Sequence, residues 1–147
     1  FDGYWSMGVI EHFWNGYDNI SKEMLRVLRV GGYLFLTFPN MSSLRKWKAR
    51  HDKYVEWKNN NTEPEGFYQF ALSSQLVLNH FNDLGFELVQ SEQDGIKGLK
   101  DEIPSLQLTL HTLYNSKNLP ATIVRKFLNL ATAPLFGHMK LLILRKS

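Results

Sequence analysis

The chain has 147 residues, a net charge of +3 and no cysteine. Without cysteine it has no disulfide framework, no thiolate zinc site and no cysteine nucleophile, and this composition fits a cytoplasmic location. The length suffices for one domain with a buried core, and the aromatic share of 14% argues against disorder. No apolar run approaches the roughly 18 residues that a membrane-spanning helix needs.

The first forty residues predict a strand, a helix and a second strand. Residues 1–10 form an apolar and aromatic run with Ser and Gly near its end, which is typical of a buried strand that reaches a loop. Residues 17–28 carry apolar side chains at helical spacing, and Gly31 and Gly32 separate them from the almost continuously apolar residues 33–38. Strands that are apolar on both faces are typical of a parallel sheet covered by helices, so this βαβ unit predicts an α/β fold.

The remainder of the chain predicts a second helix and strand, an irregular stretch, two further helices and a closing strand. The expected elements are helix 42–57, loop 59–66, helix 73–84, strand 86–89, irregular segment 90–104, helices 106–114 and 122–130, and strand 139–144. We expect one domain, residues 1–147, in which a helical insertion at residues 94–137 precedes the last strand. Its sheet would contain three strands with crossover connections and one terminal strand.

Four short motifs follow one another near the start of the chain. They are Phe1-Asp2 with Ser6, the run Val9-Ile10-Glu11-His12-Phe13, the run RVLRVGG from Arg26 to Gly32, and Pro39-Asn40. In this order and spacing they resemble the fourth strand, the following helix and the fifth strand of class I S-adenosylmethionine-dependent methyltransferases of the type 11/12 kind. Residues 72–86 resemble the next helix and the sixth strand of that family, and the last strand resembles its closing antiparallel strand.

The resemblance implies a Rossmann-like methyltransferase sheet, of which this chain is the C-terminal portion with strands 4–7 and their crossover helices. The family's glycine-rich loop after the first strand and its acidic residue after the second strand, which hold the cofactor, have no counterpart in the sequence. We therefore expect the N-terminal half of the parent enzyme to lie outside these residues, and these residues alone to be inactive. The sheet edge that is left open should cause self-association.

The segment that ends the first strand supplies the candidate cofactor and catalytic residues. Ser6, Met7 and Gly8 match family positions that line S-adenosyl-L-methionine near its methionine part; the alternative is strand-end packing with a turn at Gly8. Glu11 and His12 offer a carboxylate and an imidazole that can take a proton from a substrate hydroxyl, the alternative being that they anchor the loop. We expect no metal site, because adjacent residues leaving a strand point apart.

Residues 42–66 are a candidate lid, made of a basic helix and a polar loop. Between residues 44 and 58, six basic side chains stand against two acidic ones. Trp47 and Tyr54 lie on or beside the apolar face of the helix, and Trp14 and Tyr68 lie near expected strand ends, so these four are candidate substrate-binding residues. The alternative is an ordinary amphipathic helix whose apolar stripe is core and whose charges are solvated.

The function implied by the resemblance is S-adenosylmethionine-dependent methyl transfer to a small-molecule acceptor, with O-methylation as one form. Two alternatives stay open. One is a non-catalytic, methyltransferase-like scaffold that pairs with another chain. The other is an RNA-modifying methyltransferase that contacts RNA through the basic helix at residues 45–58. Because the basic residues are local, we do not expect a uniformly nucleic-acid-binding surface.

Overall fold

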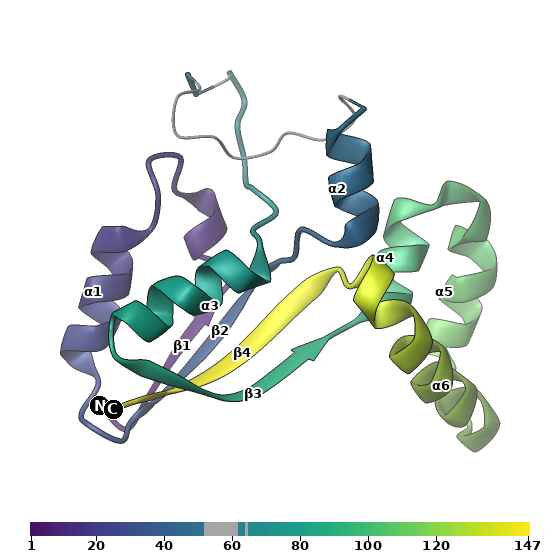
Figure 1. Cartoon of the computed structure of the whole chain (residues 1–147). Coiled ribbons are helices and arrows are strands. Elements are labelled where there is room, and N and C mark those ends of the chain that lie inside the picture. Colours follow the sequence, from purple (N-terminus) through teal and green to yellow (C-terminus); the bar gives the residue numbers. More distant parts are fainter. Residues whose placement is uncertain (52–61, 64) are drawn as a thin grey trace. The chain divides into compact units, whose positions relative to one another are not determined.

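The computed structural model of the chain describes residues 1–51, 62–63 and 65–147 (Figure 1). The chain divides into two compact units. Unit 1 comprises Phe1–Asn40, Val55–Glu92 and Lys140–Ser147, and unit 2 comprises Met41–Tyr54 and Gln93–Met139. Unit 1 therefore contains the predicted βαβ segment, and unit 2 contains the residues for which a helical insertion is expected.

Unit 1 begins with the predicted βαβ arrangement. Its elements are β1 (Gly3–Met7), the 3-10 turn η1 (Ile10–His12), α1 (Asp18–Val27) and β2 (Tyr33–Pro39). β1 and β2 pair in parallel, with Ser6 opposite Leu36 and Met7 opposite Thr37. Gly31, whose φ of 77° is readily adopted only by glycine, lies in the turn between α1 and β2.

The sheet is completed by two later strands in an order that differs from their order in the chain. After α3 (Ser74–Asp83) come β3 (Phe86–Gln93) and finally β4 (Met139–Lys146), and across the sheet the order is β1-β2-β4-β3 (Figure 1). The backbone of Lys146 exchanges hydrogen bonds with Gly31 and Gly32, just before β2 begins, so β4 runs antiparallel to β2. This mixed α/β sheet confirms the predicted fold class.

The core of unit 1 lies between one face of the sheet and two helices. Alternate residues of β2 and β4 are buried there with side chains of α1 and α3, as the period of two in a strand requires. The buried residues are Leu34, Leu36 and Phe38 of β2, Leu142 and Leu144 of β4, Met24 of α1 with Leu28, and Val77 and Phe81 of α3. Each such side chain contributes about 1.5–3 kcal/mol through burial.

The opposite face of β1 is open. Trp5 is 65% exposed and Met7 61% exposed, although both belong to the apolar run that predicts a buried strand. The Trp5 ring stacks on the Phe35 ring of β2, with 4.7 Å between centroids and 10° between planes. Among the described residues, the apolar pattern of β1 is therefore satisfied on only one side of the strand.

Unit 2 is built from helices. They are α2 (Ser43–Ala49), α4 (Gly95–Glu102), the 3-10 turn η2 (Pro104–Leu106), α5 (Gln107–Asn115) and α6 (Leu119–Phe136). The predicted irregular segment 90–104 is wrong, because β3 extends to Gln93 and α4 follows it. The helix predicted over 42–57 ends at Ala49, and its part from residue 52 onward lies outside the described residues. None of the helices within the described part of the chain is long and apolar enough to cross a bilayer.

Two glycines let α4 and α6 touch through their backbones. A Cβ atom at Gly95 would overlap the backbone nitrogen of Ala133, and one at Gly98 would overlap the carbonyl oxygen of Phe136. Glycine disfavours an isolated helix, so the short α4 is held by this contact with α6 and not by its own propensity. By contrast, none of the α6 side chains is buried, and Phe127 and Leu130 are among the most exposed apolar residues of the chain.

Candidate functional site

The candidate site of unit 1 lies where β1 ends. After Met7 the chain turns at Gly8, which has a φ of 68° and whose N–H donates to the carbonyl oxygen of Thr37 at 3.0 Å. The η1 turn then places Glu11 and His12 directly beyond the strand. In open α/β sheets, ligands bind outside the carboxyl ends of the strands, so this turn occupies the position where chemistry is expected.

Two polar atoms at this turn are buried without a hydrogen-bond partner. Ser6 and Glu11 are each only 1% exposed, and neither the Ser6 Oγ nor the Glu11 Oε2 has a partner among the described residues. Burial raises the pKa of the Glu11 carboxyl, while its own backbone N–H and the nearby His12 act weakly in the opposite direction. Buried polar groups are nearly always paired, so two unpaired ones at a strand end indicate a site that is completed by another group.

Gly8 leaves space beside the Glu11 carboxyl, whereas the Met7 side chain points away from the turn's buried side. A Cβ at Gly8 would lie 3.3 Å from the Glu11 Oε1, so a side chain at this position would crowd the carboxyl. Met7 points to the open face of the sheet, where its sulfur lies 4.0 Å from the Thr37 Oγ1. The three predicted cofactor residues are therefore contiguous, but Ser6 faces the core and Met7 faces away from it.

His12 is separated from its neighbour Glu11. It is exposed, and its Nδ1 lies 2.6 Å from the carbonyl oxygen of Tyr68, which can only accept a hydrogen bond. Its ring meets the Tyr68 ring edge to face at 4.9 Å. The structure thus brings together one predicted catalytic residue and one predicted substrate residue, while the Glu11 carboxyl points into the protein.

The other predicted substrate residues are placed less uniformly. Trp14 packs against Phe67 at 4.9 Å and Phe70 at 5.0 Å, half-buried beside the core of unit 1. Trp47 belongs to unit 2, where it is half-exposed and lies against the His51 ring at 4.5 Å. Tyr54 lies outside the described residues.

The basic helix α2 carries a buried ion-pair cluster. The Arg45 side chain is only 4% exposed; its Nε donates to the Glu102 Oε1 at 2.7 Å, and its Nη1 to the carbonyl oxygen of His138 at 3.1 Å. Lys48 donates to the Glu102 Oε2 at 2.5 Å. Burial alone would raise the pKa of Glu102, but hydrogen bonds and charges from Lys48 and Arg45 outweigh it and lower that pKa. The alternative interpretation, an amphipathic helix whose charges are all solvated, therefore does not hold for Arg45.

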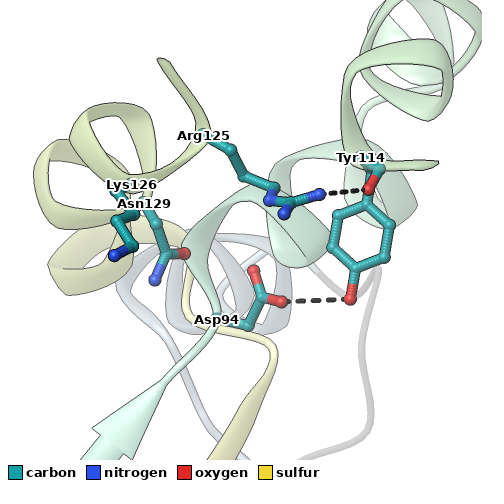
Figure 2. A pocket seen from close by; sticks show the side chains of 5 residues that line it. All are labelled: Asp94, Tyr114, Arg125, Lys126 and Asn129. Atoms are coloured by element: carbon teal, nitrogen blue, oxygen red, sulfur yellow. Dashed lines mark hydrogen bonds between the residues drawn. The ribbon is translucent and has the colours of Figure 1, made fainter. Parts of the chain in front are cut away.

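Unit 2 also contains a pocket that sequence reasoning did not find. It has a volume of about 330 Å³ and is lined by Asp94, Tyr114, Arg125, Lys126 and Asn129 (Figure 2). In the sequence, the adjacent cations Arg125 and Lys126 were the only indication of this pocket. Only the fold brings them together with Asp94 and Tyr114. Within the described part of the chain, no three His, Asp or Glu side chains gather as a metal site would require.

Neither a protein-family model nor a curated protein matches this chain. Among solved structures, it is similar over 100% of its length to a protein of Listeria monocytogenes assigned as an S-adenosylmethionine-dependent methyltransferase, with 11% identity and a TM-score of 0.54. It is similar over 99% of its length to the [4+2]-cyclase SpnF, with 19% identity and a TM-score of 0.52. The chain has a class I methyltransferase-like fold.

Further structures with this fold include a ligand-bound one. Phosphoethanolamine N-methyltransferase 2 of Haemonchus contortus, in complex with phosphomonomethylethanolamine and S-adenosylhomocysteine, matches 99% of the chain with 14% identity and a TM-score of 0.50. The chain covers 62% of the Listeria protein, 50% of SpnF and 33% of the Haemonchus enzyme, so it spans about half the length of the structures that it matches. This partial coverage fits a C-terminal portion of the class I methyltransferase-like fold.

Proposed function

We propose that this chain forms part of an S-adenosylmethionine-dependent methyltransferase that acts on a small-molecule acceptor. The observation that carries the proposal is the turn after β1, where Ser6 and Glu11 bury polar atoms without partners at the ligand-binding end of the sheet. Because the chain spans about half the length of its structural neighbours, we assign the activity to a longer protein and expect these residues alone to be inactive. The lack of cysteine supports a cytoplasmic location.

The residues at the end of β1 fit the cofactor's methionine part. S-adenosyl-L-methionine supplies an electrophilic methyl group on a sulfonium when it is bound. The unpartnered Ser6 hydroxyl can donate to a carboxylate, and Gly8 leaves the turn free of a side chain. Met7 adds an exposed, polarisable thioether on the open face at the same strand end. These three residues are the ones that we propose to hold the cofactor.

For a hydroxyl acceptor, Glu11 is the proposed general base. A carboxyl whose pKa is raised by burial is a better proton acceptor than an exposed one, which suits O-methylation. His12 is the second candidate, because donation from its Nδ1 to the Tyr68 carbonyl leaves the Nε2 as the acceptor atom. Methyl transfer depends mainly on positioning, so one base and a well-shaped pocket are sufficient.

Aromatic residues are proposed for the acceptor side of the site. Tyr68 is exposed and contacts His12, and Trp14 joins the cluster with Phe67 and Phe70. Trp47 and Tyr54 would contribute if residues 42–66 act as a lid. An RNA-modifying role receives less support, because Arg45 and Lys48 in the basic helix are already bonded to Glu102.

The decisive measurement compares two lengths of chain. We expect the 147-residue chain to give no measurable heat with S-adenosylmethionine in calorimetry, and a chain extended upstream by the rest of its reading frame to bind. Tight binding by the short chain would contradict the half-site, and an extended chain without binding would contradict the methyltransferase itself.

We also propose that β1, which ends the sheet, pairs with a second copy; a monodisperse monomer in light scattering would refute that pairing.

Within the extended protein, Glu11→Gln is the test of the base. We expect it to lower kcat with a hydroxyl acceptor by about 10²–10⁴-fold while cofactor binding stays unchanged, because the amide cannot take the proton. Glu23→Gln is the matched control, since Glu23 is an exposed carboxylate paired with Arg26. If Glu11→Gln retains full activity and His12→Gln loses it, the base is His12.

A further inference from the structure

We propose that the pocket of unit 2 binds a small organic carboxylate. The pocket lies among α4, α5 and α6, and in Figure 2 Lys126 and Asn129 lie on the left, Tyr114 lies on the right, and Arg125 and Asp94 lie between them. Its volume of about 330 Å³ is at the lower end of the range for small-molecule sites. The proposal does not depend on methyl transfer, because it rests on unit 2 alone.

Arg125 is held in one orientation by the protein. Its Nη1 donates to the carbonyl oxygen of Tyr114 at 2.7 Å and to that of Ser116 at 3.3 Å (Figure 2). These two bonds fix the plane of the guanidinium. Among the described residues, no atom accepts a hydrogen bond from the Nε or the Nη2. The free edge of the guanidinium therefore presents two parallel N–H donors, the arrangement that pairs bidentately with a carboxylate.

The acidic residue of the pocket is already engaged. The Asp94 Oδ1 accepts from the backbone N–H of Lys97 at 2.9 Å, and its Oδ2 accepts from the Tyr114 hydroxyl at 3.3 Å (Figure 2). Burial, and then the charge of Asp94, raises the pKa of Tyr114, so the phenol stays a neutral donor. Both oxygens of Asp94 therefore already accept hydrogen bonds, so this carboxylate is not available to bind a cationic ligand.

Asn129 is engaged as well. Its Oδ1 accepts from the backbone N–H of Gly95 at 2.6 Å, and its Nδ2 donates to the carbonyl oxygen of Gln93 at 3.3 Å. The charged groups of the pocket that keep free donors are therefore Arg125 and Lys126, and the second N–H of the Asn129 amide adds a neutral donor. The ligand that this arrangement suits is an anion.

Charge and shape favour a monocarboxylate over a phosphate. Two cations face one engaged carboxylate, so a singly charged ligand balances the pocket, whereas a phosphate dianion would place a second negative charge near Asp94. Tyr114 contributes an aromatic wall, and the Lys100 Nζ lies 5.4 Å from the centroid of its ring. The body of the ligand can therefore be an aromatic or aliphatic group that contacts this ring.

The probe for this site is benzoate, measured by NMR titration of the 147-residue chain, with benzamide as the uncharged analogue and inorganic phosphate as the competing anion. We expect benzoate to bind, phosphate to bind more weakly, and benzamide not to bind at matched concentration. Arg125→Gln should weaken benzoate binding at least about tenfold, and Arg125→Lys should not restore it, because the paired donors are lost. Arg26→Gln, on an exposed arginine of α1, is the matched control and should leave binding unchanged.

A second variant tests the pocket without the risk that the substitution disturbs the fold. Arg125 also bonds two carbonyl oxygens, so its removal can loosen the α5–α6 connection, whereas Lys126 is exposed and has no such role. Lys126→Glu should weaken benzoate binding several-fold with an unchanged circular dichroism spectrum. The proposal is overturned if benzamide binds as well as benzoate, if phosphate binds more tightly, or if neither variant changes the affinity.

Discussion

Unit 1 contains the buried glutamate Glu11 and unit 2 the largely buried glutamate Glu102, and their surroundings shift the two pKa values in opposite directions. Glu102 receives hydrogen bonds from Arg45 and Lys48, and its pKa is lowered. Glu11 is buried at least as deeply, keeps one oxygen without a partner among the described residues, and has a raised pKa. Burial penalises both carboxylates, so the neighbouring cations account for the difference.

The contrast distinguishes Glu102, a carboxylate that stabilises the fold, from Glu11, a carboxylate that is available for a reaction. A paired glutamate stabilises the folded state only while it is charged, and its partners leave it no free capacity to take up a proton. An unpaired buried glutamate costs stability when it is charged, and proteins keep such residues mainly where a ligand or a reaction uses them. Variants of these two residues should therefore change stability in opposite directions.

The largest effect is expected for Glu102→Gln. The amide cannot balance Arg45, whose side chain is 4% exposed, so we expect the free energy of unfolding to fall by about 3 kcal/mol. Urea denaturation followed by circular dichroism measures this change. Glu23→Gln removes an exposed ion pair and should change stability by less than about 0.5 kcal/mol. Equal effects of the two variants would remove the distinction between the buried and the exposed pair.

A smaller effect of opposite sign is expected for Glu11→Gln. At neutral pH the variant removes a carboxyl whose charged form is disfavoured by burial, so the free energy of unfolding should rise by roughly 1 kcal/mol. Because the folded pKa is raised, the destabilisation by Glu11 grows as pH rises above the ordinary value of 4.5 and is absent below it. Urea midpoints at pH 4 and pH 7 measure this difference. Destabilisation at pH 7 would mean that Glu11 has a stabilising partner.

At neutral pH the smallest effect is expected from His138, which adjoins the Glu102 cluster and acts only as the pH falls. Its Nδ1 accepts from the Arg45 Nη2 at 2.7 Å, and burial, followed by the Arg45 charge, lowers its pKa below the ordinary 6.5, against the weaker effects of Asp101 and Glu102. The unfolded chain then takes up the proton first, so stability is lost as pH falls below 6.5, by at most about 1.4 kcal/mol per pH unit. His138→Asn, which keeps an acceptor, should flatten this slope in urea midpoints between pH 6.5 and 5.

Glu102 adds its own acid dependence below that range. Its lowered pKa contributes stability above about pH 4.5 that is lost as pH falls further. Acid should therefore weaken unit 2 in two steps, first through His138 and then through Glu102. Glu102→Gln should remove the lower step and leave the upper one, and a wild-type profile that is flat from pH 6.5 to 4 would contradict both pKa directions.

The fold of unit 1 could be read from the sequence because its signals are local. Apolar periodicity gave α1 and β2 within one or two residues, and the closing strand β4 was found from its apolar run. In unit 2 the helix α4 was missed, since Gly95 and Gly98 argue against a helix until α6 is present to pack on them. The helical conformation of α4 therefore depends on its tertiary contact with α6 and not on the helix propensity of its residues.

The site was predictable in part for the same reason. The turn from Ser6 to His12 could be predicted, because its motif lies within seven residues of chain. The difference in burial between Glu11 and His12 could not, because it depends on the distant residues Phe70 and Tyr68, which pack nearby. Arg45 was expected among solvated charges. Its acceptors lie at positions 102 and 138, too far along the sequence for any spacing rule to connect.

The glycine contact between α4 and α6 also shapes the wall of the unit 2 pocket. Gly95 and Gly98 leave no room for a Cβ atom between the two helices, so a larger residue at either position would push α6 away from α4. Asp94, at the start of α4, and Asn129, on α6, would then separate, and the hydrogen bond from the Gly95 N–H to the Asn129 Oδ1 would be strained. The size of the pocket therefore depends on two glycines that do not line it.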